Sequence, residues 1–465
     1  MPINKKNSID RRGFLKLFGG GAAALSLASC KSNVASVGGG DAPIIGEVPK
    51  GKMEYRTSSK GDKVSLLGYG CMRWPLLKKP KEDGNHIDQE AVNELVDYAI
   101  EHGVNYFDTA PPYMRGWSEP VMGEALSRHP RDKYFIATKL SNANKAFWSR
   151  EASLQMYYSS FERLKVDYID YMLLHTVGSG GWDNFQARYL DNGILDFLIA
   201  EREAGRIRNL GFSFHGDIKV YDYLLSRHEE IGWDFVQIQL NYKDWDYADE
   251  TSKNNIDARY LYEELAKRDI DVVIMEPLLG GRLSKLPEYL ANMLKSDRPE
   301  KSIASWAFRY AGSFPKVISV LSGMSLVEHL QDNIINYSPL EPISEHEDQL
   351  LMDVAKLMIE YPIIECTACQ YCMPCPYGVD IPSIFTHYNK CVCEGLYPQS
   401  SQDENYREAR RAFLVGYDRS VEKLRQANHC IGCKQCVVHC PQKLKIQDEM
   451  RRVDQYVESL KQQTL

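Results

Sequence analysis

The chain between Met53 and Pro342 alternates short apolar runs with longer amphipathic segments, and this alternation restricts the possible folds more than any other feature. The apolar runs have the length and residue types of buried strands, whereas the segments between them repeat apolar residues at helical spacing. Eight strands that each precede a helix are typical of a (β/α)8 barrel, the TIM barrel. We predict the strands Val64–Gly70, Tyr106–Ala110, Tyr134–Lys139, Tyr168–His175, Ile207–Phe214, Asp234–Asn241, Asp271–Leu278 and Lys316–Gly323.

An open, doubly wound α/β sheet is the alternative, because it is built from the same strand and helix units. The first predicted helix, Gln89–Gly103, does not follow the Gly-x-Gly-x-x-Gly loop with which such sheets bind dinucleotide phosphates. The sequence therefore favours the α/β barrel. A barrel uses roughly 250 residues, so the 465-residue chain has room for further segments on both sides of it.

The composition is that of a globular protein, with 44% hydrophobic and 26% charged residues. These values exclude a disordered chain, a coiled coil and a collagen. The formal net charge is −7 and no basic stripe is visible. We therefore expect no nucleic-acid partner.

Polar side chains stand where three consecutive predicted strands end. Asp108 lies in the second strand and Tyr113 follows it, Lys139 ends the third strand, and His175 ends the fourth. In a barrel this end of the strands carries the chemistry. A phenol has an unperturbed pKa of about 10, and a nearby ammonium group lowers it, while a carboxylate fixes the ammonium group in place. The four residues therefore predict a proton-transfer site at which histidine orients a carbonyl oxygen.

The segments around these residues resemble the aldo-keto reductase family. They include Phe107-Asp108-Thr109-Ala110 with Tyr113, Ala137-Thr138-Lys139, Asp170–His175, Gly205–Arg208, Gly211–Ser213, Val236-Gln237 and Val320–Ser325. The resemblance implies that Tyr113 donates a proton to a substrate carbonyl, that Lys139 and Asp108 tune it, and that His175 orients the carbonyl. It also implies that a nicotinamide delivers hydride to a small carbonyl substrate, or removes it from an alcohol.

The same resemblance implies a set of residues that bind NAD(P)(H). They are Ser213, Gln237, Met275, Pro277, Leu278, Ser322, Gly323 and Asn333. Phe214 follows Ser213 where the family usually has asparagine, and Met275 stands where an aromatic ring commonly stacks on the nicotinamide. The stretch Gly323–Asn333 has His329 as its one potentially basic side chain. Without Arg or Lys there, a 2′-phosphate has no strong partner, so the choice between NAD and NADP stays open.

Ten of the twelve cysteines lie between Cys366 and Cys440. They contain two motifs. The first is Cys366-x-x-Cys369-x-x-Cys372-x-x-Cys375-Pro376, and the second is Cys430-x-x-Cys433-x-x-Cys436-x-x-x-Cys440-Pro441. Such clustering favours a metal or cluster domain over disulfides spread through a secreted scaffold. Zinc is one candidate for paired Cys-x-x-Cys units, although a third cysteine in each loop is more than a zinc ribbon needs.

The two motifs resemble bacterial two-cluster ferredoxin domains, in which the fourth cysteine of each run crosses to the other cluster. The resemblance implies two 4Fe-4S clusters. One would be held by Cys366, Cys369, Cys372 and Cys440, and the other by Cys430, Cys433, Cys436 and Cys375. Cys391 and Cys393 fit neither motif. A barrel with a C-terminal ferredoxin-type domain is itself a branch of the aldo-keto reductase family, and Cys71-Met72-Arg73 and Ile363–Pro382 resemble that branch.

The N-terminus resembles a twin-arginine export signal, with Arg11-Arg12 directly before Phe14-Leu15-Lys16. The apolar run Leu17–Ala28 is short for a transmembrane helix. Leu27-Ala28-Ser29-Cys30 resembles a lipoprotein cleavage site, which implies a periplasmic protein tethered to the membrane through a lipid on Cys30. We divide the chain into a signal peptide (1–29), a flexible tether (30–52), the barrel (53–342) and a mainly helical, ferredoxin-like domain (343–465).

We therefore expect an oxidoreductase that interconverts a carbonyl and an alcohol, coupled to or structurally supported by two 4Fe-4S clusters. Hydride transfer moves two electrons together, whereas such clusters pass single electrons, and no flavin site is visible. A redox partner protein is one way to connect two-electron hydride transfer with one-electron transfer by the clusters. The alternative is an electron-transfer iron-sulfur protein whose barrel is a non-catalytic or altered-cofactor scaffold. A ligand-binding lipoprotein would leave the cysteines unexplained.

Overall fold

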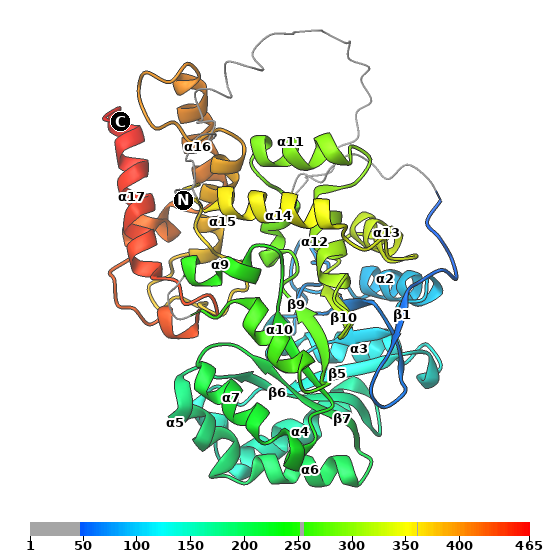
Figure 1. Cartoon of the computed structure of the whole chain (residues 1–465). Helices are drawn as coiled ribbons and strands as arrows, with labels where there is room; N and C mark the ends of the chain where they lie inside the picture. The colour runs from blue at the N-terminus through cyan, green and yellow to red at the C-terminus, as the bar shows by residue number, and fades with distance from the viewer. Residues whose placement is uncertain (1–46, 252–254, 360) are drawn as a thin grey trace, which may run out of the picture. The chain divides into compact units, whose positions relative to one another are not determined.

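The computed structural model describes residues 47–251, 255–359 and 361–465 (Figure 1). The expected export signal, Cys30 and most of the expected tether lie outside these residues. In the part of the chain that is described, no helix has both the length and the apolar character that crossing a bilayer requires.

Eight parallel strands form a closed barrel in the order β10-β3-β4-β5-β6-β7-β8-β9, which confirms the predicted (β/α)8 fold. Each predicted strand is present, with ends shifted by a few residues. The barrel strands are β3 (Leu67–Gly70), β4 (Tyr106–Asp108), β5 (Phe135–Leu140), β6 (Ile169–Val177), β7 (Ile207–Phe214), β8 (Phe235–Gln239), β9 (Asp271–Met275) and β10 (Val317–Ser322).

An antiparallel hairpin of β1 (Tyr55–Thr57) and β2 (Lys63–Ser65) precedes the barrel. Its turn lies against the N-terminal ends of the barrel strands. The backbone N–H of Ser59 donates to Asp271 Oδ2 over 2.6 Å, and the Tyr171 hydroxyl donates to Asp62 Oδ2 over 2.9 Å. The hairpin therefore covers the end of the barrel opposite to the C-terminal strand ends.

Helices surround the strands and bury apolar faces against them. Helix α2 begins at Asp88, whose side chain accepts from the backbone N–H of Ala91, and α4 is capped in the same way by Ser149. The helices are α2 (Gln89–Glu101), α3 (Ser118–Leu126), α4 (Arg150–Leu164), α5 (Gly181–Phe185), α6 (Ile194–Glu203), α7 (Ile218–Ser226), α8 (His228–Ile231), α9 (Asp244–Thr251), α10 (Ala258–Ala266), α11 (Glu288–Asp297), α12 (Ile303–Gly312) and α13 (Val327–Asn336).

The interior of the barrel is filled by a separate group of side chains, which includes Tyr106, Tyr171, Phe235, Val273 and Ile318. Tyr171 makes edge-on ring contacts with Tyr106 and Phe235 at centroid distances of 5.0 and 5.1 Å. The barrel is thus a packed core. Its chemistry is confined to the rim, as in other barrels of this type.

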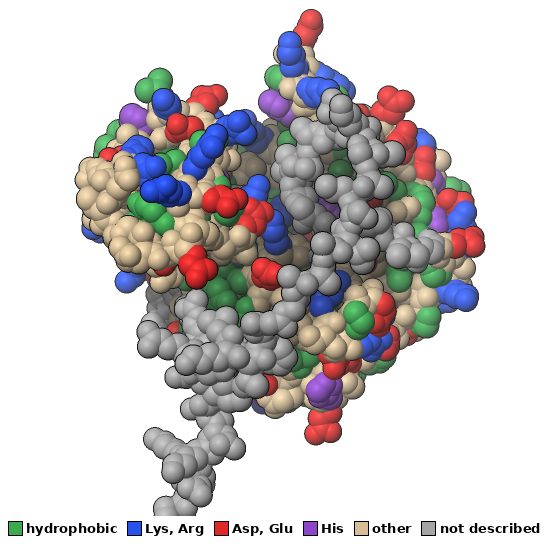
Figure 2. Space-filling view, turned by 90° about the horizontal axis from the view of Figure 1, so that it is seen from above, with side chains coloured by type: hydrophobic (Ala, Val, Ile, Leu, Met, Phe, Trp, Pro, Cys, Tyr) green, Lys and Arg blue, Asp and Glu red, His purple; other side chains and the backbone are tan. Residues whose placement is uncertain are grey.

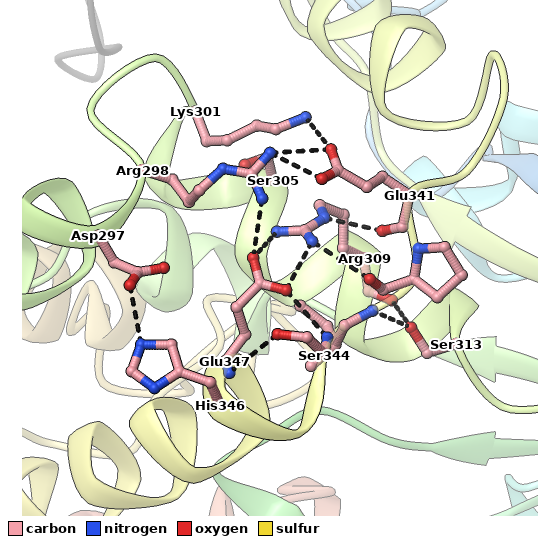
Figure 3. Close-up of polar contacts among 12 residues, drawn as sticks. Asp297, Arg298, Lys301, Ser305, Arg309, Ser313, Glu341, Ser344, His346 and Glu347 are labelled. Atoms are coloured by element: carbon pink, nitrogen blue, oxygen red, sulfur yellow. Dashed lines mark hydrogen bonds and ion pairs between the residues drawn. The ribbon is translucent and has the colours of Figure 1, made fainter.

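Helix α14 (Glu345–Met358) lies in the segment that we assign to the C-terminal domain, yet its buried residues belong to the hydrophobic core of the barrel. Ser344 caps it, and Glu347 accepts from the buried Arg309 (Figure 3). The Arg309 Nη1 to Glu347 Oε1 distance is 2.8 Å, and Arg298 Nη2 lies 2.8 Å from Glu341 Oε1. This ion-pair network fixes α14 on the barrel.

The C-terminal region is mainly helical, as predicted, and has its own hydrophobic core. Helices α15 (Ile381–Cys393), α16 (Tyr406–Ser420) and α17 (Ile446–Gln462) bury Phe385, Tyr388, Phe413, Tyr456 and Leu460 among them (Figure 1). The two cysteine runs lie in the loops before α15 and before α17. We call residues 361–465 the cysteine module.

Acidic and basic side chains are mixed on the face of the molecule that Figure 2 shows.

Candidate active site

The structure brings together the four predicted catalytic residues at the C-terminal ends of the strands. Lys139 on β5 donates from Nζ to Asp108 Oδ1 over 2.5 Å, and to the carbonyl oxygen of Thr109 over 2.8 Å. Asp108 is the last residue of β4, and both side chains are buried. Asp108 and Lys139 thus form a buried ion pair, and the parallel pairing of β4 with β5 places the two side chains next to each other.

Tyr113 begins the short 3-10 helix η1 (Tyr113–Gly116) directly after β4. Lys139 Nζ lies 4.9 Å from the centroid of its ring, a distance suited to a cation–π contact. The His175 ring lies edge-on to it at 5.9 Å, with an interplanar angle of 76°. Met114 and Arg115 follow with φ of 52° and 58°, so the chain turns sharply after the tyrosine. The tyrosine is half-buried, which leaves it accessible to a small molecule.

Burial dominates the electrostatics of this group. It raises the pKa of Asp108 and lowers that of Lys139, and each of the two charges partly offsets the effect on the other. Burial and the charge of Asp108 raise the pKa of Tyr113 well above its usual value. Burial, with Lys139 and Arg188 nearby, lowers the pKa of His175 well below its usual value. At neutral pH the site thus holds a protonated phenol and a neutral imidazole.

Two further residues fix the histidine, and sequence reasoning missed both. Ser141 Oγ lies 2.6 Å from His175 Nδ1. The buried Arg188 donates from Nη2 to the His175 carbonyl oxygen over 2.6 Å. Ser141 is two residues beyond Lys139, a signal that strand alternation could have supplied. Arg188 lies in the π-helical turn η4 (Gln186–Leu190), 13 residues after His175, where no strand-end pattern marks it.

The predicted nucleotide-binding residues lie on or directly after β7, β8, β9 and β10, except Asn333, which lies on α13, and several already have partners. Ser213 Oγ accepts from the backbone N–H of Thr176 over 2.9 Å, and Ser322 Oγ accepts from Asn333 Nδ2 over 3.0 Å. Gln237 Nε2 donates to Asp108 Oδ2 over 3.1 Å. Gln237 therefore contacts the catalytic ion pair, and its role toward a nucleotide stays a prediction.

The remaining residues that we predict to contact the nucleotide lie at or after the ends of β9 and β10. Met275 ends β9, Pro277 and Leu278 lead into the 3-10 helix η5 (Leu279–Ser284), and Gly323 follows β10. Between Met275 and Pro277, Glu276 has a φ of 55° and is half-buried. Burial raises the pKa of its carboxyl group. The sequence analysis predicted no role for Glu276.

The cysteine module contacts this end of the barrel directly. Arg73 Nη2 donates to the Thr367 carbonyl oxygen over 2.7 Å, and Arg282 Nη2 donates to Glu365 Oε1 over 2.9 Å. Gln442 Nε2 donates to Gln239 Oε1 over 3.1 Å. The start of the first cysteine run and the segment after the second are thus bound to the end of β8 and to the loops that follow β3 and β9.

One residue of the cysteine module affects the predicted catalytic tyrosine. An interaction with Tyr371, which lies between Cys369 and Cys372, partly opposes the effect of burial on the pKa of Tyr113. No strand-end pattern marks Tyr371, because it belongs to a loop nearly 260 residues away along the chain. Sequence reasoning therefore missed it.

Cysteines of the two motifs lie near one another. Cys366, Cys369, Cys372 and Cys440 line one mainly apolar cavity with Ile381 and Phe385. Burial and the neighbouring Cys440 raise the pKa of Cys366 to about 11, and burial with Cys430, Cys433 and Cys375 raises that of Cys436 to about 11. Cys440 of the second run thus lines the same cavity as three cysteines of the first run, and the division of the eight cysteines between two clusters stays a prediction.

All cysteines in the described residues are free thiols. Among residues 47–251, 255–359 and 361–465, no group of three or more His, Cys, Asp or Glu side chains is arranged to hold a metal ion. Cys391 is buried with its Sγ 3.5 Å from His387 Nε2, and Cys71 is buried with its Sγ 3.4 Å from Met122 Sδ. These two thiols lie outside both sets.

The chain is similar to known oxidoreductases over the barrel. L-Galactose dehydrogenase of Arabidopsis thaliana is 26% identical over 316 residues, which cover 64% of this chain and 92% of that protein. The NADH-specific methylglyoxal reductase of Escherichia coli (strain K12) is 24% identical over 309 residues, or 58% of this chain and 90% of that protein.

A solved structure has the same fold. The holo form of aldo-keto reductase AKR11C1 from Bacillus halodurans aligns with a TM-score of 0.51 at 22% identity, over 65% of this chain and 96% of that chain. The model of the aldo/keto reductase family matches residues 66–347, which is more than half of the chain. The chain therefore belongs to the aldo/keto reductase family of NAD(P)-dependent oxidoreductases.

Proposed function

We propose that this protein reduces a small carbonyl compound, or oxidises the matching alcohol, with Tyr113 as the proton donor. The observation that carries the proposal is the position of the Tyr113 ring, 4.9 Å from Lys139 Nζ and 5.9 Å from the His175 ring. When bound, the nicotinamide supplies the hydride that adds to the carbonyl carbon. The hydroxyl of Tyr113 gives its proton to the carbonyl oxygen, so its O–H bond breaks as that of the alcohol forms.

The other three residues support this proton transfer. The ammonium group of Lys139 stabilises the phenolate that Tyr113 becomes, and Asp108 holds the ammonium group in place. Ser141 occupies Nδ1 of His175, which leaves Nε2 to orient the carbonyl oxygen. In the reverse direction the phenolate of Tyr113 takes the proton of the alcohol.

The residues that would hold the nucleotide favour NAD over NADP. Ser213, Ser322 and Asn333 offer polar groups around the rim, and Met275 offers an apolar surface to the nicotinamide ring. The stretch Gly323–Asn333 has neither Lys nor Arg, and burial lowers the pKa of His329, so that this histidine is neutral at pH 7. The name of the NADH-specific relative agrees with this preference.

The test is a comparison of Tyr113→Phe with the wild-type protein, in assays that follow NADH oxidation by a panel of small aldehydes and ketones. General acid catalysis contributes about 10²-fold or more, so we expect at least that loss in Tyr113→Phe, with unchanged NADH binding. Undiminished reduction by Tyr113→Phe would refute the proposed role of the tyrosine.

We propose further that the two cysteine sets hold two 4Fe-4S clusters. The support is the apolar cavity lined by Cys366, Cys369, Cys372 and Cys440, together with the four-thiol neighbourhood of Cys436. These cysteines would hold the clusters, which would supply one-electron transfer. Iron and acid-labile sulfide analysis of anaerobically purified protein decides the matter, since zinc without sulfide would refute the clusters.

An electron-transfer role with a redox partner is the second candidate. Cys433 is exposed, and the neighbouring Ile431 and Val438 are 63% and 73% exposed. Residues 423–447 contain five Lys and Arg but no Asp or Glu, which suits an acidic partner surface. If Tyr113→Phe loses carbonyl reduction but passes single electrons from a chemical reductant to an acceptor at the wild-type rate, the two activities are separate.

We also propose export by the twin-arginine route and attachment to a membrane through a lipid on Cys30. The support is the sequence alone, since these residues lie outside the described part of the chain. Replacing Arg11 and Arg12 by Lys should retain the precursor in the cytoplasm. Cys30→Ala should release the mature protein from the membrane fraction, and a variant that stays membrane-bound would contradict the lipid anchor.

A further inference from the structure

Strand β6 has one extra residue at the end that carries His175. Its pairing with β7 shifts register between Leu174 and Val177, so that three steps along β6 oppose two along β7. Thr176 within this bulge has a φ of 50°, a region that β-branched side chains seldom occupy. A bulge redirects a side chain, and a strained residue persists only where its surroundings hold it. The direction of the His175 side chain therefore depends on the groups that hold the bulge.

Side chains contact all four backbone polar groups of His175 and Thr176. The backbone N–H of His175 donates to the Tyr189 hydroxyl over 3.0 Å. That of Thr176 donates to Ser213 Oγ over 2.9 Å. Arg188 donates from Nη2 to the His175 carbonyl oxygen over 2.6 Å and from Nη1 to that of Thr176 over 3.3 Å. The planar guanidinium group thus spans both residues of the bulge.

Tyr189 fastens the bulge to the neighbouring strand. Its hydroxyl donates to the carbonyl oxygen of Leu140, the last residue of β5, over 3.0 Å. Leu140 pairs with Leu174, where the regular pairing of β5 with β6 ends. The same hydroxyl accepts from Arg188 Nη2 over 3.1 Å. One phenol thus joins the two strands at the point where their backbone pairing stops.

Arg188 is a buried cation. Its side chain is 1% exposed, and within the described residues all of its hydrogen-bond partners are uncharged. A buried charge without a counter-charge is costly for stability, which points to a role in the adjacent site. Burial lowers the pKa of His175, and the charges of Lys139 and Arg188 lower it further. The imidazole beside Arg188 therefore stays neutral at pH 7.

Arg188 and Tyr189 are neighbours in the π-helical turn η4. Such turns are rare and are frequent at functional sites. Asn142, two residues beyond β5, anchors η4 by both ends of its amide group. Its Nδ2 donates to the Arg188 carbonyl oxygen over 2.9 Å, and its Oδ1 accepts from Arg188 Nε over 3.2 Å. The turn is therefore fixed on the rim with both side chains against the bulge.

We infer that Arg188 and Tyr189 are positioning residues of the carbonyl site, which hold the bulge of β6 so that the imidazole of His175 faces the substrate oxygen. The inference rests on the proposed function. Ser141 contacts Nδ1 of the neutral ring, so the Nε2–H is the group that donates to the carbonyl oxygen. Arg188 and Tyr189 act on the backbone behind the ring and take no part in proton transfer.

The first test compares Tyr189→Phe with Tyr157→Phe in the full-length protein. Tyr157 is buried as well, and its hydroxyl donates to Glu201 between α4 and α6. Loss of a hydrogen-bonding hydroxyl should lower kcat/KM for the carbonyl about tenfold in Tyr189→Phe, with the Kd of NADH within about twofold. Equal kcat/KM values for the two variants would overturn the inference.

Arg188→Lys tests the guanidinium group, with Arg202→Lys as its control. Arg202 on α6 also donates to two backbone carbonyl oxygens, those of Ile231 and Gly232. Lysine keeps the charge at both positions but cannot reproduce the fork. We expect kcat/KM for the carbonyl to fall about tenfold or more in Arg188→Lys and to stay within about twofold in Arg202→Lys. Matching values would refute the role of Arg188.

A third measurement does not depend on activity. In protein that carries 15N in its histidine rings, the resonances of His175 are identified by their loss in His175→Asn. We expect them to move in Tyr189→Phe and to stay in place in Tyr157→Phe, and unmoved resonances would overturn the inference. A wild-type protein that reduces no carbonyl would contradict the proposed function instead, and the resonances would still decide whether η4 positions His175.

Discussion

Gln237 on β8 donates a hydrogen bond of 3.1 Å to Oδ2 of Asp108 on β4, across the barrel from its own strand. The other carboxylate oxygen of Asp108 accepts from Lys139. Gln237 thus satisfies the remaining acceptor of a buried ion pair. Buried charges need such partners, because an unsatisfied buried polar group is costly.

Replacing Gln237 by Leu should therefore destabilise the protein and disturb the catalytic pair. The side chain stays close in size, but Asp108 Oδ2 loses its donor. We expect a loss of about 1–3 kcal/mol in the free energy of unfolding, measured by chemical denaturation, and a fall in kcat smaller than that of Tyr113→Phe.

Gln155 supplies the control for this variant, because it is exposed on α4. Gln155→Leu should leave both stability and kcat within error of the wild-type values. If Gln237→Leu were as stable as Gln155→Leu, the hydrogen bond to Asp108 would contribute nothing to the buried pair.

The ion pair itself should show strong coupling between its two members. Lys139→Met leaves Asp108 buried without its counter-charge, which should cost about 3–5 kcal/mol of unfolding free energy. Asp108→Asn together with Lys139→Met should cost less than the sum of the single changes, since neither charge is then stranded. Additive effects in denaturation experiments would show that the two groups do not interact in the folded protein.

The strand–helix alternation predicted the barrel well because hydrophobic periodicity is local. Each strand carries its own signal, so all of the barrel strands could be placed within a few residues. The positions of Asp108, Tyr113, Lys139 and His175 followed from the strands, because the C-terminal ends of parallel strands meet on one rim. The structure brings these four together as the barrel geometry requires.

Contacts between distant segments were not predictable in the same way. Thr367 reaches the rim because the cysteine module folds back onto the barrel, and nothing in its local sequence encodes that docking. Arg188 supports His175 from the π-helical turn Gln186–Leu190, which the strand–helix alternation does not mark. Helix α14 reads as an ordinary amphipathic segment, so its packing into the barrel core could not be derived from its pattern alone.

Glu347 at the start of α14 should make the protein less stable in acid. Burial raises the pKa of its carboxyl group, but hydrogen bonds from Arg309 and Ser344 outweigh burial and lower the pKa to about 2 (Figure 3). A depressed pKa stabilises the folded state above the unfolded value of about 4.5, and this contribution is lost as pH falls from there toward 2. The shift corresponds to about 3 kcal/mol.

The exposed Glu345 in the same helical turn is the matched control. Glu347→Gln should lower stability at pH 7 and flatten the dependence of unfolding free energy on pH between 4.5 and 2. Glu345→Gln should reproduce the wild-type curve. Equal slopes for Glu347→Gln and wild type would show that Arg309 does not hold this carboxylate in solution.

Gly280 in η5 should be indispensable for seating the loop Cys366–Cys375 on the barrel. A Cβ at this position would lie 2.3 Å from the Thr367 carbonyl oxygen and 2.5 Å from its Cα, both of them backbone atoms that cannot rotate away. Gly280→Ala should therefore push the loop off the barrel rim. We expect a lower kcat and faster proteolysis around residue 367.

Gly281 separates this steric effect from backbone strain. Its φ is +100° and that of Gly280 is +68°, so alanine is unfavourable at both positions, at about 1–2 kcal/mol, but a Cβ at Gly281 meets nothing closer than Ser284 Oγ at 4.0 Å. Gly281→Ala should lose some stability but keep the wild-type rate of proteolysis around residue 367. If both variants were cleaved there equally fast, backbone strain in η5, and not the contact with Thr367, would control the seating of the loop.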